Sequence, residues 1–218
     1  MKRFLALLAA AFCLTGCGVV TSTRPFLGPA DAQGTPGLKP GLWAVVEPGC
    51  RFNTAAAAAK WPECASPLDI REGVVTDLKA KGEGGALDHP IVFILAVGDP
   101  MIIQAQMPAD GPPGPADFVY AGLRALATDD SGVITRARIW PALCAKPQAK
   151  AGPGLPPRPL PGLTMLQGPA ANCLARNRGA LRNAVETSER WVFDEGQTSE
   201  GLTAQWVRDK DRWSLRSQ

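Results

Sequence analysis

Residues 91–107 read IVFILAVGDPMIIQAQM, and this stretch decides the fold class. Its first seven residues are all apolar, and the run after Gly98-Asp99-Pro100 alternates between apolar and polar residues toward its end. Two apolar runs across a three-residue turn are typical of a β-hairpin. A run that is apolar on both faces indicates a central strand. The stretch therefore predicts a sheet built from antiparallel hairpins.

Further strands are expected on both sides of this hairpin. A second hairpin is predicted because two apolar segments flank Thr128-Asp129-Asp130-Ser131-Gly132, a run of turn-forming residues. A terminal hairpin around the charged run at residues 208–212 would close the sheet. The expected strands outside 91–107 are Leu42–Val46, Ile70–Leu78, Phe118–Ala127, Val133–Trp140, Leu202–Val207 and Trp213–Leu215.

Two helices complete the expected fold. Asn53 or Thr54 can cap a helix through the five alanines that follow, and Pro62 would end it. A later helix is predicted to begin at Gly168-Pro169 and to bury a stripe of small and apolar residues. This stripe comprises Ala170, Cys173, Leu174, Leu181, Ala184, Val185 and Ser188. The predicted fold is α+β, a predominantly antiparallel, barrel-like β meander with one short N-terminal and one C-terminal helix.

The start of the chain indicates export. Met1-Lys2-Arg3 is basic, residues 4–14 are apolar, and Leu14-Thr15-Gly16-Cys17 follows. The apolar segment is too short to span a bilayer, so residues 1–16 are predicted to be a signal peptide. The four residues ending in Cys17 resemble the lipobox of bacterial lipoproteins. The alternative is an ordinary signal peptide that ends by chance in cysteine.

The lipoprotein resemblance implies that Cys17 becomes the first residue of the mature protein. It would carry a diacylglycerol on sulfur and a fatty acyl group such as palmitate on its amine, which together anchor a protein stably. In this family an Asp after the cysteine favours the inner membrane. Gly18 stands there, so the resemblance implies the outer membrane, with the protein facing the periplasm. Exposure on the cell surface is the alternative.

Composition sets the domain layout and excludes one class of partner. Residues 17–39 are rich in Gly, Pro, Ser and Thr and are expected to form a flexible tether, with a single globular domain over 40–218. Of the 23 basic residues, Lys2 and Arg3 lie in the signal, leaving 21 against 20 acidic residues. A nearly neutral mature chain gives no electrostatic support for nucleic acid as a partner.

Four cysteines remain in the predicted mature domain, namely Cys50, Cys64, Cys144 and Cys173. In an exported chain an even number indicates disulfides, and four cysteines permit three pairings. We expect Cys50–Cys64 and Cys144–Cys173, because each bond then closes a locally plausible unit. The alternative, a four-cysteine metal site, lacks the CxxC spacing that such sites use.

No catalytic or cofactor pattern emerges, and we expect neither enzymatic activity nor a bound metal or cofactor. His89 is the single histidine and precedes Pro90. The paired carboxylates Asp129/Asp130 and Asp209/Asp211 fall in predicted turns, where Asp is favoured by local hydrogen bonds. The six tryptophans are expected mainly in the core or at strand ends, although such rings can also stack on sugars.

Gly41-Leu42-Trp43 resembles the G-x-W opening of the lipocalins, which form eight-stranded barrels with a late helix followed by a strand. This resemblance implies a carrier of a small apolar ligand. The sequence is therefore compatible with three alternative functions. The first is a non-enzymatic binding or accessory module, held to the membrane through Cys17 and contacting an envelope protein. The others are a lipocalin-like carrier and an enzyme that acts on cell-wall glycan.

Overall fold

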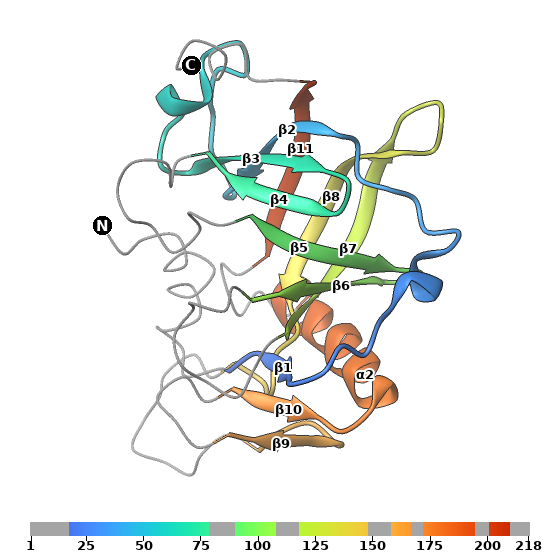
Figure 1. Cartoon of the computed structure of the whole chain (residues 1–218). Helices are drawn as coiled ribbons and strands as arrows, with labels where there is room; N and C mark the ends of the chain where they lie inside the picture. The colour runs from blue at the N-terminus through green and yellow to red at the C-terminus, as the bar shows by residue number, and fades with distance from the viewer. Residues whose placement is uncertain are drawn as a thin grey trace.

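The computed structural model describes residues 18–78, 90–107, 118–147, 158–166, 172–194 and 201–209. Eight antiparallel strands in this part of the chain close into a barrel (Figure 1). Seven of them follow one another as a meander, and β11 closes the ring between β8 and β2. The barrel strands are β2 (Gly41–Val46), β3 (Ala65–Arg71), β4 (Val74–Asp77), β5 (Ile91–Ala96), β6 (Met101–Gln106), β7 (Phe118–Thr128), β8 (Ile134–Pro141) and β11 (Leu202–Arg208).

Three short strands extend the sheet from β7, in the order β1 (Val20–Ser22), β10 (Cys173–Ala175) and β9 (Leu163–Met165). Strand β1 pairs antiparallel with β7 and parallel with β10. These strands lie together at the lower end of the molecule in Figure 1. The predicted antiparallel, barrel-like sheet is confirmed, and the extension adds to it.

Two of the three hairpins predicted from the sequence are present, and the second arm of the terminal hairpin, Trp213–Leu215, lies outside the described residues. Strands β5 and β6 pair around residues 97–100, and β7 and β8 pair around residues 129–133. The expected single strand over Ile70–Leu78 is instead the second half of a hairpin formed by β3 and β4. Glu72 and Gly73 both have positive φ angles, of 48° and 76°. Such a pair is typical of a type I′ turn, which joins two strands tightly.

The barrel encloses an apolar core because side chains alternate between its two faces. Trp43, Leu123 and Ile134 are fully buried in this interior. The indole nitrogens of Trp43 and Trp206 donate to the carbonyl oxygens of Lys39 and Pro40, at 2.7 and 3.0 Å. Further residues packed on this cluster are half-buried, among them Val45, Leu68, Val75, Phe93, Ile103 and Ile139.

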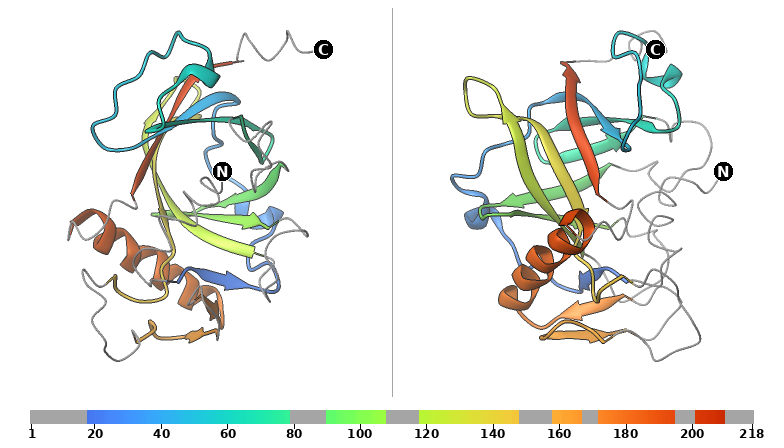
Figure 2. Two further views of the ribbon diagram at one scale, coloured as in Figure 1. Left: turned by 90° about the vertical axis from the view of Figure 1, so that its left-hand side faces the viewer. Right: turned by 180° about the vertical axis from the view of Figure 1, so that it is seen from behind.

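The helix α2 (Arg178–Glu189), continued by a π-helical turn over Arg190–Asp194, lies against the outside of the barrel (Figure 2). The two together are called the helical element below. The indole nitrogen of Trp140 on β8 donates to the carbonyl of Val185 at 2.9 Å. The ring of Trp140 also meets Phe193 edge-on, with centroids 5.7 Å apart. This contact fixes the helix to the sheet.

The C-terminal helix begins later than the sequence predicted. Asn177 caps it by accepting a hydrogen bond from the backbone nitrogen of Ala180 at 2.9 Å. Cys173 lies before this cap, on strand β10. The expected helical stripe is therefore wrong at Cys173 and Leu174, and Ala170 lies outside the described residues. It is confirmed at four buried positions, Leu181, Ala184, Val185 and Ser188.

The predicted N-terminal helix is wrong. The alanine run forms a loop with one short 3-10 turn, Ala58–Lys60 (η2). The guanidinium of Arg208 donates to the carbonyl oxygens of Thr54 and Ala56, the latter at 3.0 Å. An α-helix would need these carbonyls for its own backbone. Because so short a helix is marginal even in alanine-rich sequence, the long-range contacts to Arg208 prevail.

The expected flexible tether is also wrong for residues 18–39. Val20 and Leu27 are buried, and a 3-10 turn over Pro29–Ala32 (η1) follows. The side-chain oxygen of Gln104 accepts hydrogen bonds from the backbone nitrogens of Phe26 and Leu27 at 2.8 and 2.9 Å. These distant partners order a segment whose own composition favours disorder.

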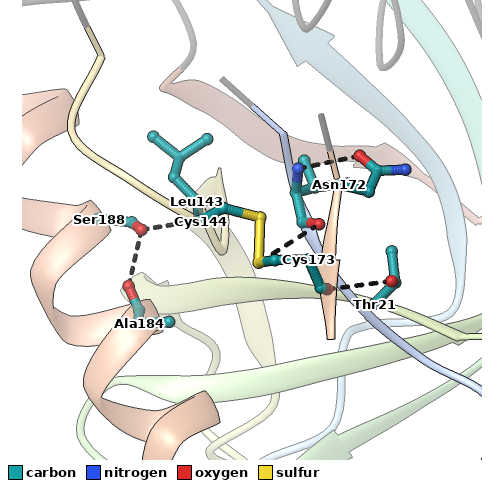
Figure 3. Close-up of a disulfide and its surroundings, with 8 residues drawn as sticks. Thr21, Leu143, Cys144, Asn172, Cys173, Ala184 and Ser188 are labelled. Carbon is teal, nitrogen blue, oxygen red and sulfur yellow. Dashed lines mark hydrogen bonds between the residues drawn. A yellow bond between two sulfur atoms is a disulfide. The ribbon is translucent and has the colours of Figure 1, made fainter. Parts of the chain in front are cut away.

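Both predicted disulfides are confirmed, Cys50–Cys64 and Cys144–Cys173. The first closes the loop between β2 and β3. The second joins β10 to the segment after β8 (Figure 3). The sequence predicted Cys173 on the helix, so that this bond would have tied the helix to the sheet. Within the described residues no helix combines the length and hydrophobicity needed to cross a membrane. The signal segment, Cys17, His89, Asp211 and Trp213 lie outside these residues.

Candidate functional site

A groove of about 690 Å³ runs over the outer face of β8, β11 and β2. The end of the helical element bounds one side, and the loop closed by Cys50–Cys64 bounds the other. In the right-hand view of Figure 2 the helical element lies below β11, and the loop lies beside the upper end of this strand. The residues that line the groove include Arg136, Arg138, Thr203, Gln205, Phe52 and Phe193. A hollow of this volume lies within the range of small-molecule sites.

Two arginines on β8 give the groove its chemistry. Ala137 between them is fully buried in the barrel core, so Arg136 and Arg138 point outward, about 6.7 Å apart along the strand. Among the described residues, neither guanidinium takes part in a salt bridge or hydrogen bond. The carbon at the centre of the Arg138 guanidinium lies 4.4 Å from the centroid of the Phe193 ring, a cation–π contact that holds it without using its donors.

Strand β11 places hydrogen-bonding groups directly beside these arginines. Thr203 lies opposite Arg138 and Gln205 opposite Arg136 in the antiparallel register. Both face outward because Ala204 between them is buried in the barrel core. A hydroxyl, an amide and two guanidiniums thus line one strip of the sheet. They can donate together to the oxygens of a carboxylate or phosphate.

The groove is not uniformly basic. Glu47 lies at the end of β2, and Asp194 at the end of the helical element, both with exposed side chains. On the opposite side, Phe52 packs against Trp61 with ring centroids 4.8 Å apart. Charges are therefore segregated, with the positive strip in the middle, acidic groups at two edges and an aromatic wall under the disulfide-closed loop.

Of the paired carboxylates, Asp129 has a structural role. The Asp129 carboxylate accepts from the hydroxyl of Ser131 at 2.6 Å and pairs with Lys39 at 3.1 Å. The Ser131 hydroxyl first, and the Lys39 ammonium next, lower the pKa of Asp129 to about 2. It closes the β7–β8 turn, as its sequence context predicted. No cluster of His, Cys, Asp or Glu suited to a metal is found in the part of the chain that the structure describes.

Of the predicted site residues, Cys50 lines the groove and its bond to Cys64 holds the rim. Cys144 and Cys173 lie in the extension of the sheet instead. Sequence reasoning missed the groove. The available signal was the alternation in Arg136-Ala137-Arg138, which places two charges on the outer face of a strand.

Comparison with known proteins returns no match, since no family model, curated sequence or solved structure is significantly similar to the chain. The site must therefore be judged from its own geometry.

Proposed function

We propose that this chain is a bacterial envelope lipoprotein, anchored in the outer membrane through Cys17 and facing the periplasm. The support is the signal-like start with its lipobox resemblance and the geometry of the cysteines. All four cysteines of the folded domain are paired, which is expected of a protein that folds in an oxidising compartment.

The anchored domain acts as a non-enzymatic binding module, and the groove over β8, β11 and β2 is its binding surface. The observation that carries this proposal is the outward-facing pair of Arg136, which is exposed, and Arg138, which is half-buried. Neither has an acidic partner among the described residues. A barrel needs no such pair for stability, because its core is apolar and its strands pair with one another. Unpaired arginines beside donors and aromatic rings are typical of binding surfaces.

The partner is an extended polypeptide segment of another envelope protein, with acidic side chains two residues apart. Alternate side chains of an extended segment recur about every 6.7 Å. This repeat matches the outward spacing of Arg136 and Arg138, so one carboxylate can meet each guanidinium. Gln205 and Thr203 then supply further donors to the same segment.

The test uses two labelled hexapeptides, one with Glu at alternate positions and one with Gln in their place. Fluorescence anisotropy with the processed full-length protein should show tighter binding of the Glu peptide. A charge-assisted hydrogen bond contributes about 1.5–3 kcal/mol, so the variant Arg136→Gln/Arg138→Gln should weaken binding at least tenfold. The matched control Arg158→Gln/Arg176→Gln changes two exposed arginines elsewhere and should leave binding unchanged. Equal binding of both peptides, or equal losses in both variants, would refute the proposal.

A second function, a lipocalin-like carrier of a small apolar ligand, is favoured by one observation. Phe93, Ile103 and other inner side chains of the closed barrel are half-buried rather than fully covered. Eight-stranded barrels can hold one small ligand. Native mass spectrometry of the protein isolated from a bacterial envelope decides between the two functions. A bound apolar molecule that is lost in Phe93→Arg would support the carrier, and a bare mass would exclude it.

A further inference from the structure

The folded domain begins directly after the proposed anchor. The backbone nitrogen of Cys144 donates to the carbonyl of Gly18 at 2.9 Å, and that of Cys173 to the carbonyl of Val19 at 3.2 Å. The backbone nitrogen of Val19 donates to the side chain of Asn172 at 3.1 Å (Figure 3). The disulfide joins the two cysteines of this corner. One residue reaches about 3.6 Å, so a lipid on Cys17 would hold this corner at the membrane surface.

The same end of the molecule is basic. Residues 18–30 and 131–185 contain no Asp or Glu. They include β1, β9 and β10, together with β8 and the first part of α2. Arg24, Arg158 and Arg176 are exposed there. The carboxylate of Asp31, at the border of this region, is bound by the guanidinium of Arg178 at 2.7 Å. The acidic groups that would offset the exposed arginines are thus missing from this stretch of sequence.

The described contacts bring Arg158 and Arg176 to one corner. Leu160, two residues after Arg158, donates its backbone N–H to the carbonyl of Cys144 at 2.8 Å. Arg176 donates its backbone N–H to the carbonyl of Gly162 at 3.0 Å. Strand β9 between these contacts is the last strand in the sheet order. In Figure 1 it forms the end of the molecule opposite the loop after β2.

We propose that this end, formed by β1, β9, β10 and residues Arg158 and Arg176, docks on anionic phospholipid headgroups beside the anchor. The proposal rests on the proposed lipidation of Cys17 for the covalent attachment. Each basic residue close to an anionic bilayer strengthens binding about fivefold. Docking would hold the barrel in one orientation, with the loop closed by Cys50–Cys64 directed away from the bilayer.

The experiment places the processed lipoprotein on vesicles of phosphatidylethanolamine, with or without phosphatidylglycerol, and follows amide hydrogen exchange. Exchange over residues 158–166 and 172–176 should slow several-fold on the anionic vesicles, and high salt should reverse the effect. Arg158→Gln/Arg176→Gln should abolish the slowing. Arg136→Gln/Arg138→Gln, on the groove, should leave it intact. Equal exchange on both lipids, or slowing that survives Arg158→Gln/Arg176→Gln, would overturn the proposal.

The mass of the N-terminal peptide separates this proposal from the proposed lipidation. If Cys17 carries no lipid, the proposed anchor is refuted. Flotation of the same protein with the two vesicle types then measures only the binding of the basic end to the headgroups. Flotation with anionic vesicles that Arg158→Gln/Arg176→Gln weakens about 25-fold, two steps of about fivefold, supports docking. Absence of flotation refutes it.

Discussion

Replacing Gly122 with alanine should loosen the attachment of the helix to the barrel. Gly122 lies on β7 directly opposite Trp140 on β8. A Cβ atom at this position would lie 2.2 Å from Cε2 and 2.4 Å from Cζ2 of the Trp140 indole. The indole is 1% exposed and donates to Val185 at 2.9 Å. It therefore cannot move aside without losing contacts.

The magnitude follows from these contacts. Overpacking of a core costs about 1–3 kcal/mol, and loss of the indole hydrogen bond adds about 1 kcal/mol. Urea unfolding followed by circular dichroism, with disulfides intact, should show Gly122→Ala destabilised by about 2–4 kcal/mol. Gly37→Ala is the matched control, because nothing lies within 4 Å of its added Cβ, and it should change stability by less than about 0.5 kcal/mol.

A second variant isolates the cause. In a Trp140→Leu background the added methyl group has room, so Gly122→Ala should cost clearly less than it does in the native chain. An equal cost in both backgrounds, or an unfolding midpoint of Gly122→Ala that matches the native protein, would refute the reasoning that Gly122 exists to admit the indole.

Three further outcomes are expected. Arg208→Met removes the donors that hold the Thr54 and Ala56 carbonyls and should lower the free energy of unfolding by about 1–2 kcal/mol, read by urea titration. Replacing both Cys144 and Cys173 with serine opens a link of sequence separation 29 and should cost ~3.6 kcal/mol in the same assay, so an unchanged midpoint would contradict it. Because the pKa of Asp129 is lowered to about 2 from an ordinary value near 3.9, its ionised form stabilises the fold above about pH 4, and this stabilisation is lost as the pH falls toward 2. Asp129→Asn should therefore lose less stability between pH 4 and 2 than the native protein does.

The sequence could predict the barrel strands that carry strong local patterns. The apolar run beginning at Ile91 and the turn containing Asp129 specify their hairpins without distant help, because alternation and turn chemistry act over a few residues. The cysteine pairing could be predicted for a similar reason, since each bond joins segments that come together nearby in the chain.

Features decided by distant contacts could not be predicted. The alanine loop is shaped by Arg208, whose hydrogen bonds to it span 154 and 152 positions in the sequence. Strand β1 exists because β7 and β10 flank it. Its three residues carry no local signal that separates them from a linker. Intrinsic helix and loop preferences are small beside such tertiary contacts.

The groove could not be predicted either, because it is formed by residues that are distant in the sequence. Arg138 and Thr203 become neighbours only because β11 enters the barrel between β8 and β2. Alternation in the sequence placed both arginines on an outer face, but it could not show which strand lies beside them. That no described residue pairs its charge with Arg136 or Arg138 also becomes visible only when the surrounding side chains are in place.

The most direct test of the account is the intact mass of the mature protein extracted from a bacterial outer-membrane fraction. The account predicts a chain that begins at Cys17, carries a diacylglycerol and an acyl chain, and is four hydrogens lighter than the reduced form because of its two disulfides. A chain that begins elsewhere, that lacks lipid on Cys17 or that contains free thiols would contradict it.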